Sequence, residues 1–574
     1  MSSRSPDAFP RSEHPYGPGR GGPGEPEDPH ELLHHARRLT ADAHPGAADA
    51  WERAATALRR TDGVLAPGDH ADALDAAALD RLGPVRSIAG PLFTRAADLH
   101  EQAGQRGKAL ISRARALLAG PEPGGTARAA LDELHERAAV LHTTGHASVA
   151  EAVTVRLSRD LAVAELLDTT PDPDVEAAVL RAELIRLIAF AVPHAAEPAV
   201  SRVLADTRAL LGRITAPDDP PAALPLLRAA VAGHRFGGRP WCAAVHEPLL
   251  AAVLRATGAH REAAALLRAA LAADEPTAPL RTDDRIRLLL SLARTLASQR
   301  EGEGEREQRR AEGGEPTGDE PGALRPGGPG ASPEPGAGTA AEEVTTPDGP
   351  TAPSADPADE RLALLVEAVR LADTAGSDPR LGACAHLGLG IAYVERGRAR
   401  EAVAFLERAA AGPAGDDDPA ERVRAGALLA YCALLLDEPH RAAVEYARAA
   451  ETALAWDDLR HATALHRRAG QAFEAAGAPE EAARSYRRAD ELYRTHGEHD
   501  TADSHGSTVG GGTGSAPGTG GADAEAGGGG LPPGPLGLPG TDAPVGRYRM
   551  NVYGEVGGVG PRAAAAPGTR QGCV

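Results

Sequence analysis

The sequence has few of the residues on which many enzymes depend. Lys108 is the only lysine among 574 residues, and aromatic residues make up 3% of the chain. P-loop NTPases, protein kinases and Schiff-base enzymes need a lysine at a defined position, and Lys108 lies in "GQRGKAL" without the Walker spacing. No GxSxG motif is present. These absences argue against the common nucleotide-dependent and covalent catalytic mechanisms.

Cysteines are few, and long apolar runs and an excess of positive charge are absent. The cysteines form no CxxC pair, which excludes the usual disulfide and zinc frameworks. No apolar run approaches the roughly 20 residues of a membrane span, and residues 1–28 lack the apolar core of a signal peptide. The net charge of −20 argues against a nucleic-acid partner, because phosphate binding needs a basic face. We therefore expect a cytoplasmic protein that binds neither membrane nor nucleic acid.

Ala, Leu, Arg, Gly and Pro are abundant, and they are unevenly distributed along the chain. Residues 1–28, 301–357 and 498–574 are rich in Gly and Pro or in acidic residues, and they carry net charges of −2, −9 and −3. Leu324 and Val344 are the only large aliphatic residues of the middle stretch. Such segments cannot bury enough apolar surface to offset the entropy of ordering, so all three are predicted to be disordered. The codon bias implied by this composition is typical of a high-GC, actinobacterial genome.

The remaining sequence has the periodicity of α-helices. Segments such as "DVEAAVLRAELIRLIAFAV" and "PAVSRVLADTRALLGRI" place apolar residues three and four positions apart, and no window alternates as a strand does. Gly, Pro or Asp separates one helical segment from the next. The predicted fold class is all-α.

Three copies of a 40-residue repeat lie in the C-terminal part. In each copy the first helix carries a small residue and, three positions later, an aromatic or small residue. A turn follows, and the second helix then carries Ala, a large residue and Ala on one face. Glycine at the turn relieves the strain of a left-handed helix end. The repeated positions are Gly390, Ala430 and Gly470; Tyr393, Ala433 and Phe473; Ala402, Ala442 and Ala482; Leu406, Tyr446 and Tyr486; and Ala409, Ala449 and Ala489.

These helix hairpins resemble tetratricopeptide repeats (TPRs). The resemblance rests on "LGLGIAYVERGRAREAVAFLERA" and "RAGQAFEAAGAPEEAARSYRRA", with a less regular copy between them and another at "HEPLLAAVLRATGAHREAAALLRAALAA". The usual repeat has 34 residues, and the longer form is similar to that of bacterial signalling regulators. The resemblance implies an α-solenoid of helix hairpins with a long disordered insertion and disordered tails.

The chain divides accordingly into repeat regions and linking segments. "DDRIRLLLSLARTLASQ" has the character of a first helix and "DERLALLVEAVRLADTAG" that of a second, so the acidic segment between them is interpreted as an insertion inside one hairpin. Long surface insertions cost little closure entropy. The predicted regions are a disordered start at 1–28, degenerate TPR-like helices at 29–238, TPR-like repeats at 239–300, the insertion at 301–357, clear repeats at 358–497 and a Gly-rich tail at 498–574.

The resemblance also implies a function and a site. TPR proteins hold a peptide or a partner helix against the first helices of their hairpins, so we expect a non-enzymatic scaffold or regulatory adaptor with a protein or peptide partner, no cofactor and no metal. Buried packing is the competing interpretation for Leu387 and Ile391. The positions carried over to this groove are Leu387, Ile391, Glu395, Arg424, Ala427, Tyr431, Arg467, Gln471 and Glu474.

A zinc-dependent hydrolase is the alternative. "HELLH" at residues 30–34 would place His30 and His34 on one helix face for zinc, with Glu31 as the base. The motif borders a disordered segment, and Arg37 and Thr40 occupy the positions where an extended motif needs glycine and histidine. A solvated first helical turn is the favoured interpretation.

The tail carries one further segment of interest, at 545–556. In "VGRYRMNVYGEV" polar and apolar residues alternate from Arg547 to Val552, which is the period of a strand. A lone strand is unstable in water, so the segment is predicted to dock on a sheet edge or in a groove. Self-docking in the groove of the same chain, docking on an external partner and a frayed tail are the interpretations left open.

Overall fold

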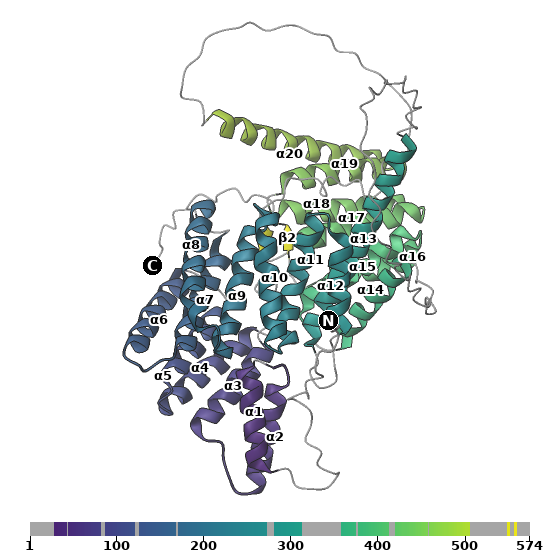
Figure 1. Cartoon of the computed structure of the whole chain (residues 1–574). Helices are drawn as coiled ribbons and strands as arrows, with labels where there is room; N and C mark the ends of the chain where they lie inside the picture. The colour runs from purple at the N-terminus through teal and green to yellow at the C-terminus, as the bar shows by residue number, and fades with distance from the viewer. Residues whose placement is uncertain are drawn as a thin grey trace, which may run out of the picture.

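The computed structural model describes residues 28–42, 44–81, 86–120, 125–167, 170, 172–272, 280–312, 357–374, 377–412, 419–456, 458–505, 548–550 and 556–558. Within these ranges the chain forms twenty α-helices, one 3-10 turn and two strands of three residues each (Figure 1). The prediction of an all-α fold is confirmed. Among the described residues no helix is both long enough and apolar enough to span a membrane.

The helices are mostly of 12 to 19 residues. Many begin at a proline, which suits the first helical turn because that turn does not need the missing N–H. They are α1 Pro29–Ala41, α2 Ala47–Arg60, α3 Pro67–Arg81, α4 Arg86–Gln102, α5 Arg106–Leu118, α6 Gly125–Thr143, α7 Val149–Leu166, α8 Pro173–Ala191, η2 Val192–His194, α9 Pro198–Thr215, α10 Pro220–Phe236, α11 Pro240–Ala256, α12 His260–Ala272, α13 Thr282–Glu312, α14 Pro357–Thr374, α15 Pro379–Glu395, α16 Ala399–Ala410, α17 Pro419–Leu435, α18 Pro439–Leu454, α19 Leu459–Ala475 and α20 Pro479–His505.

The helices stack as a solenoid. Each helix packs on the next one along the chain, and the odd-numbered helices also pack on one another in the series α5, α7, α9 and in the series α11, α13, α15, α17. Within each series the odd-numbered helices form a continuous layer. Such nearest-neighbour packing of helix pairs is the architecture of a repeat protein, and the predicted TPR-like α-solenoid is confirmed.

The repeated positions of the sequence explain the packing of each hairpin. A Cβ atom on Gly390 of α15 would lie 2.6 Å from Cδ2 of Leu406 on α16, and one on Gly470 of α19 would lie 2.6 Å from Cε1 of Tyr486 on α20. The small residue of the first helix thus makes room for the large residue of the second. Ala430 and Tyr446 belong to the equivalent pair of helices, α17 and α18.

The turns of these hairpins are equivalent as well. Gly397, Asp437 and Gly477 adopt positive φ angles of 70°, 62° and 71°. Directly after each of them, a backbone N–H donates to a carbonyl five residues back: Arg398 to Tyr393, Glu438 to Ala433 and Ala478 to Phe473, at 2.8–2.9 Å. This is the bond that closes a helix ending in a left-handed residue. Asp437 shows that the turn tolerates a residue other than glycine.

The acidic segment lies between two helices of one hairpin. Ile286, Leu289 and Leu290 of α13 share a hydrophobic core with Leu365 and Val369 of α14, as the sequence predicts for the two flanking helices. α13 continues to Glu312, past residue 301, where the insertion was predicted to start. α20 continues to His505, past residue 497, where the last repeat was predicted to end. Helix propagation from a stable packed turn accounts for both.

Deleting 301–356 and joining α13 to α14 with a short Gly/Ser turn is expected to leave the fold intact. The two helices already share a core, and shortening the loop lowers its closure cost by only about 2 kcal/mol, at about 0.6 kcal/mol for each halving of length. Thermal unfolding followed by circular dichroism checks this. A large loss of helical signal or of Tm in the deletion variant would show that the segment contributes to the structure.

The turn between α1 and α2 contacts helices far along the chain. Trp241 of α11 donates from Nε1 to the carbonyl oxygen of Asp42 at 3.2 Å, and Arg202 of α9 donates to the carbonyl oxygen of Ala41 at 3.1 Å. The rings of His44 and Trp241 meet edge to face with centroids 4.4 Å apart. The first hairpin is thereby fixed to the middle of the solenoid.

A buried carboxyl in α7 makes stability depend on pH. Asp160 is fully buried; its Oδ1 accepts from Arg159 at 3.0 Å, while Oδ2 has no hydrogen-bond partner among the described residues. Burial raises the pKa of Asp160 from 3.8 to about 6. Between these values the folded chain holds a proton that the unfolded chain releases, so stability falls as the pH rises from 4 to 6.

Asp160→Asn is therefore expected to raise the free energy of unfolding by about 2 kcal/mol at pH 7.5 and to have little effect at pH 4. Denaturant titrations of both proteins at the two pH values measure this difference. Equal stabilisation at both, or destabilisation at pH 7.5, would contradict the account of this carboxyl.

The tail contains a short β-hairpin. β1 (Tyr548–Met550) pairs antiparallel with β2 (Val556–Gly558), with Tyr548 opposite Gly558. The strand predicted within 545–556 therefore finds its pairing strand in the tail itself. Residues 545–547 and 551–555 lie outside the described residues, and docking of this segment on the solenoid or on another protein stays a prediction.

Candidate partner-binding face

The groove positions expected from the sequence all lie on odd-numbered helices, in two different environments. Leu387 of α15 is 5% exposed, and Ile391 is partly buried against the same core. That core also contains Leu406 and Leu429, from the neighbouring helices α16 and α17. Leu387 and Ile391 are therefore packing residues first, as the competing interpretation anticipated.

The remaining positions are more accessible. Arg424 is exposed and Tyr431 is half-buried on α17, and the buried Ala427 lies between them on the same helix face. Arg467, Gln471 and Glu474 are exposed on α19. These side chains form a stripe that the cores leave accessible, and they are available for contact with a partner.

Two of the α19 side chains also contact the last helix. The guanidinium of Arg467 lies 5.6 Å from the ring centroid of Tyr493, and Glu474 accepts from the hydroxyl of Tyr486 at 2.9 Å. Both partners belong to α20. Arg467 and Glu474 therefore help to fix the end of the described solenoid, in addition to any contact with a partner.

An arginine-rich set of side chains lies further along the same layer. Arg294 of α13 pairs with Glu421 of α17 at 3.7 Å, although α15 lies between these helices in the layer. Packed helices are about 8–10 Å apart, so a flat layer would hold α13 and α17 roughly 16–20 Å apart. The pairing across this span indicates that the layer is concave on this side.

We call this set the inner patch, and it has more positive than negative groups. Arg361 pairs with Glu395, and Cys384 donates to Glu421 at 2.7 Å. The glutamates are thus engaged within the protein, while the patch keeps an excess of two positive charges. Its members are Arg255, Arg294, Arg361, Glu395, Glu421 and Arg424.

Two arginines of the inner patch are surrounded by protein yet reached by water. Burial lowers the pKa of Arg424, whereas nearby Glu421 raises it, and the side chain is nevertheless exposed. Burial, with the charge of Arg294, lowers the pKa of Arg255 to about 10. Both remain cations at neutral pH. A partly desolvated arginine gains more from an anionic partner than one in open solvent does.

Arg255 and Arg294 were not among the residues expected from the sequence. The groove positions were carried over only onto the three clear repeats, and α13 is separated from those repeats by the long insertion. The sequence signal was present nonetheless, since Arg255 lies in "HEPLLAAVLRATG" and Arg294 in "DDRIRLLLSLARTLASQ", which are both predicted first helices.

The HELLH motif forms no metal site among the described residues. His30, Glu31 and His34 are all exposed on α1. The one group of three or more potential metal ligands within the described ranges is formed by Asp206, His234 and His246, on α9, α10 and α11. The structure thus offers no third ligand for zinc at residues 30–34 in the part of the chain it describes.

Comparison with known proteins gives similarities of fold only. No family model and no curated protein matches the chain. Similar solved structures include the TPR-like repeats of a putative kinesin light chain from Podosopora anserina (15% identity, 44% of this chain and 95% of that chain, TM-score 0.28). The apo form of the quorum sensor NprR from B. thuringiensis (12%, 73% and 97%, 0.38) and human IFIT1 with m7Gppp-AAAA (13%, 82% and 95%, 0.37) are also similar.

Proposed function

We propose that this chain is a non-enzymatic adaptor that binds an acidic peptide segment of a partner protein on the inner patch. The observation that carries the proposal is the pairing of Arg294 with Glu421 across α15, since it marks a concave face that gathers side chains from several hairpins. A concave face on stacked hairpins suits an extended peptide or a helix.

The chemistry of the inner patch favours a carboxylate ligand. Arg255 donates to the hydroxyl of Thr295 at 3.2 Å, and Arg424 has no carboxylate within ion-pair distance among the described residues. Arginine presents a planar fork of donors that matches a carboxylate, and such charge-assisted bonds are about twice as strong as neutral ones. Binding should therefore weaken as the salt concentration rises.

A protein ligand suits the chain better than a nucleic acid or a small substrate. A nucleic acid carries a phosphate charge every few ångströms, and the excess of two positive charges on the inner patch would neutralise few of them. The chain as a whole has a net charge of −20. Cys242, Cys384 and Cys432 form no disulfide among the described residues, which fits the reducing environment of the cytoplasm, and we place the protein there.

Selection from a random peptide library displayed on phage tests the proposal. Peptides retained by the full-length protein are expected to be enriched in Asp and Glu. Arg424→Glu is expected to lose this enrichment and to bind a selected acidic peptide about tenfold or more weakly, because it removes a charge-assisted contact and adds repulsion. Fluorescence anisotropy with the labelled peptide measures the affinity.

Arg484→Glu is the matched control. Arg484 lies on α20 with a side chain that is 67% exposed and away from the inner patch in sequence and in helix layer. This variant has the same change of net charge and should bind as the original protein does. Equal losses in both variants, or a selection without acidic enrichment, would overturn the proposal. Binding of a labelled single-stranded RNA in place of the peptides would also overturn it.

A further inference from the structure

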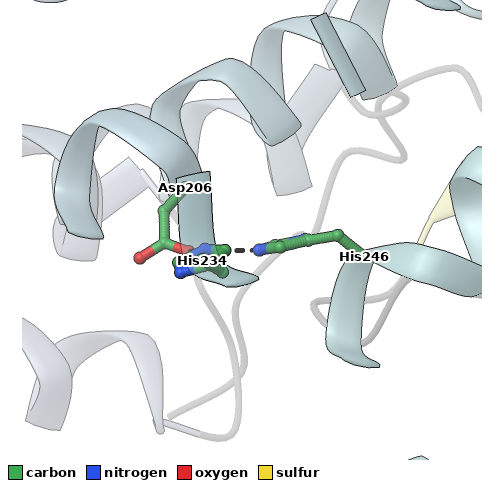
Figure 2. A group of neighbouring side chains, drawn as sticks. All are labelled: Asp206, His234 and His246. Carbon is green, nitrogen blue, oxygen red and sulfur yellow. Dashed lines mark hydrogen bonds and ion pairs between the residues drawn. The ribbon is translucent and has the colours of Figure 1, made fainter. Parts of the chain in front are cut away.

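Two histidines and one aspartate converge between consecutive hairpins, outside the inner patch. Asp206 lies on α9, His234 near the end of α10 and His246 on α11, and Figure 2 shows the three side chains pointing toward one another. The Nε2 atoms of both imidazoles lie 3.1 Å from the same carboxylate oxygen, Oδ1 of Asp206. The two rings are stacked, with centroids 5.4 Å apart and planes inclined by 19°.

This arrangement is more than a histidine held by a carboxylate. One carboxylate would suffice to hold the buried His234, yet a second imidazole presents the same nitrogen to the same oxygen. His234 has no exposed surface, and its Nδ1 lacks a hydrogen-bond partner among the described residues. The hydrogen bonding of this imidazole among the described residues is therefore limited to the Nε2 atom that faces Asp206.

We propose that Asp206, His234 and His246 bind a divalent transition-metal ion of the zinc class. Bonds of about 2.0–2.2 Å from a metal to imidazole nitrogen and carboxylate oxygen place adjacent ligand atoms about 3.3 Å apart in a tetrahedron. The 3.1 Å separations from Oδ1 of Asp206 to each Nε2 match this after movements of a few tenths of an ångström, and all three ligand atoms lie within 4.8 Å of one another. Two imidazoles with one carboxylate select zinc, cobalt or nickel over magnesium and calcium, which prefer oxygen ligands.

Two arginines lie near the site, since Arg115 interacts electrostatically with Asp206 and Arg239 with His234. Arg239 is the buried cation next to His234, and its Nη1 donates to the carbonyl oxygen of Pro198. The carboxylate of Asp206 supplies one negative charge toward the ion. Water fills the remaining coordination position, as it does in zinc sites with three protein ligands.

The place of the site in the fold suggests what the ion does. Its ligands come from three consecutive helices, so a bound ion links the hairpin of α9 and α10 to the next one. Trp241, which contacts the α1–α2 turn, lies on α11 five residues before His246. The ion therefore stabilises the part of the solenoid to which the first hairpin is fixed, independently of any partner at the inner patch.

Metal binding by the full-length protein tests this inference. After removal of metal by a chelator, the protein is expected to take up one zinc ion per chain in equilibrium dialysis, and added zinc is expected to raise its Tm. Cobalt in place of zinc should give the visible absorption of a four-coordinate ion. His246→Ala, which changes the half-buried ligand, should lower the zinc affinity by more than about tenfold and abolish the Tm shift.

His194→Ala is the control, because His194 is exposed on η2. It should keep the uptake, the cobalt spectrum and the Tm shift of the original protein. Asp206→Asn guards against misfolding of a single variant, and circular dichroism verifies that each variant is helical. Uptake of no stoichiometric metal by the original protein, or unchanged uptake by both ligand variants, would overturn the proposal.

Discussion

Gly390→Leu is expected to lower the free energy of unfolding of the C-terminal repeats by about 3 kcal/mol, at the upper end of the usual cost of overpacking. Already the first side-chain atom would meet Leu406 at 2.6 Å, and Leu406 is itself fully buried between α15, α16 and α17. The helices would have to separate to admit the new side chain. Urea titration followed by circular dichroism measures the change.

Alanine variants at two glycines of α15 separate packing from helix propensity. A Cβ on Gly382 would meet only Ala372, at 3.8 Å, which is ordinary contact. Gly382→Ala should therefore gain up to about 1 kcal/mol from helix propensity, whereas Gly390→Ala should not. If Gly390→Leu and Gly390→Ala were both as stable as the original protein, the packing of α15 on α16 would not be as described.

Trp241→Ala is expected to free the first hairpin from the middle of the solenoid. Truncating a buried tryptophan costs about 3–5 kcal/mol, and this one also loses its hydrogen bond to Asp42 and its ring contact with His44. Because the α1–α2 turn contacts α9 and α11 through few groups, the effect should be concentrated there. Hydrogen exchange measured by mass spectrometry is expected to accelerate in residues 29–60.

The same measurement on Trp456→Ala provides the comparison. Trp456 is half-buried in the turn between α18 and α19, far along the chain from the first hairpin. Its truncation should increase exchange locally and leave α1 and α2 unchanged. Unaltered exchange of the first hairpin in Trp241→Ala would mean that the contact with α11 does not hold it.

The sequence predicted the C-terminal half of the fold best, because its physical constraints recur. Gly390 and Gly470 are each paired with a large residue sixteen positions later, and the turns at Gly397 and Gly477 need a left-handed residue. A recurrence every 40 residues makes such features visible without a structure. The N-terminal half lacks these columns, so its helices were predicted but their pairing was not.

Contacts between distant segments of the chain produce no comparable pattern in the sequence. Trp241 and Asp42 are 199 residues apart, and nothing in either local sequence indicates the other. The ligands Asp206, His234 and His246 likewise form no spaced motif, because they are brought together by the stacking of three helices. The HELLH motif, in contrast, has metal-ligand spacing but lies exposed on α1.

The sequence led to a proposed position for the groove but not to the accessibility of its residues. The resemblance to TPRs placed the groove on the first helices of the hairpins, of which α11, α13, α15 and α17 pack on one another in turn. The resemblance also selected Leu387 and Ile391, whose side chains pack against the core. It omitted Arg255 and Arg294, which contribute to the inner patch. Which members of a helix face stay accessible depends on the curvature of the stack, and curvature is not encoded in one helix.

Site-specific photocrosslinking tests most directly whether partners bind on the inner face. A benzoylphenylalanine replaces Tyr431, half-buried on α17, in one sample and Val444, 47% exposed on α18, in another. A labelled acidic peptide from the display selection is added, and crosslinked product is quantified on irradiation. We predict a crosslink from position 431 that Arg424→Glu abolishes, and none from position 444. Crosslinking from position 444 but not from position 431 would contradict a partner-binding inner face.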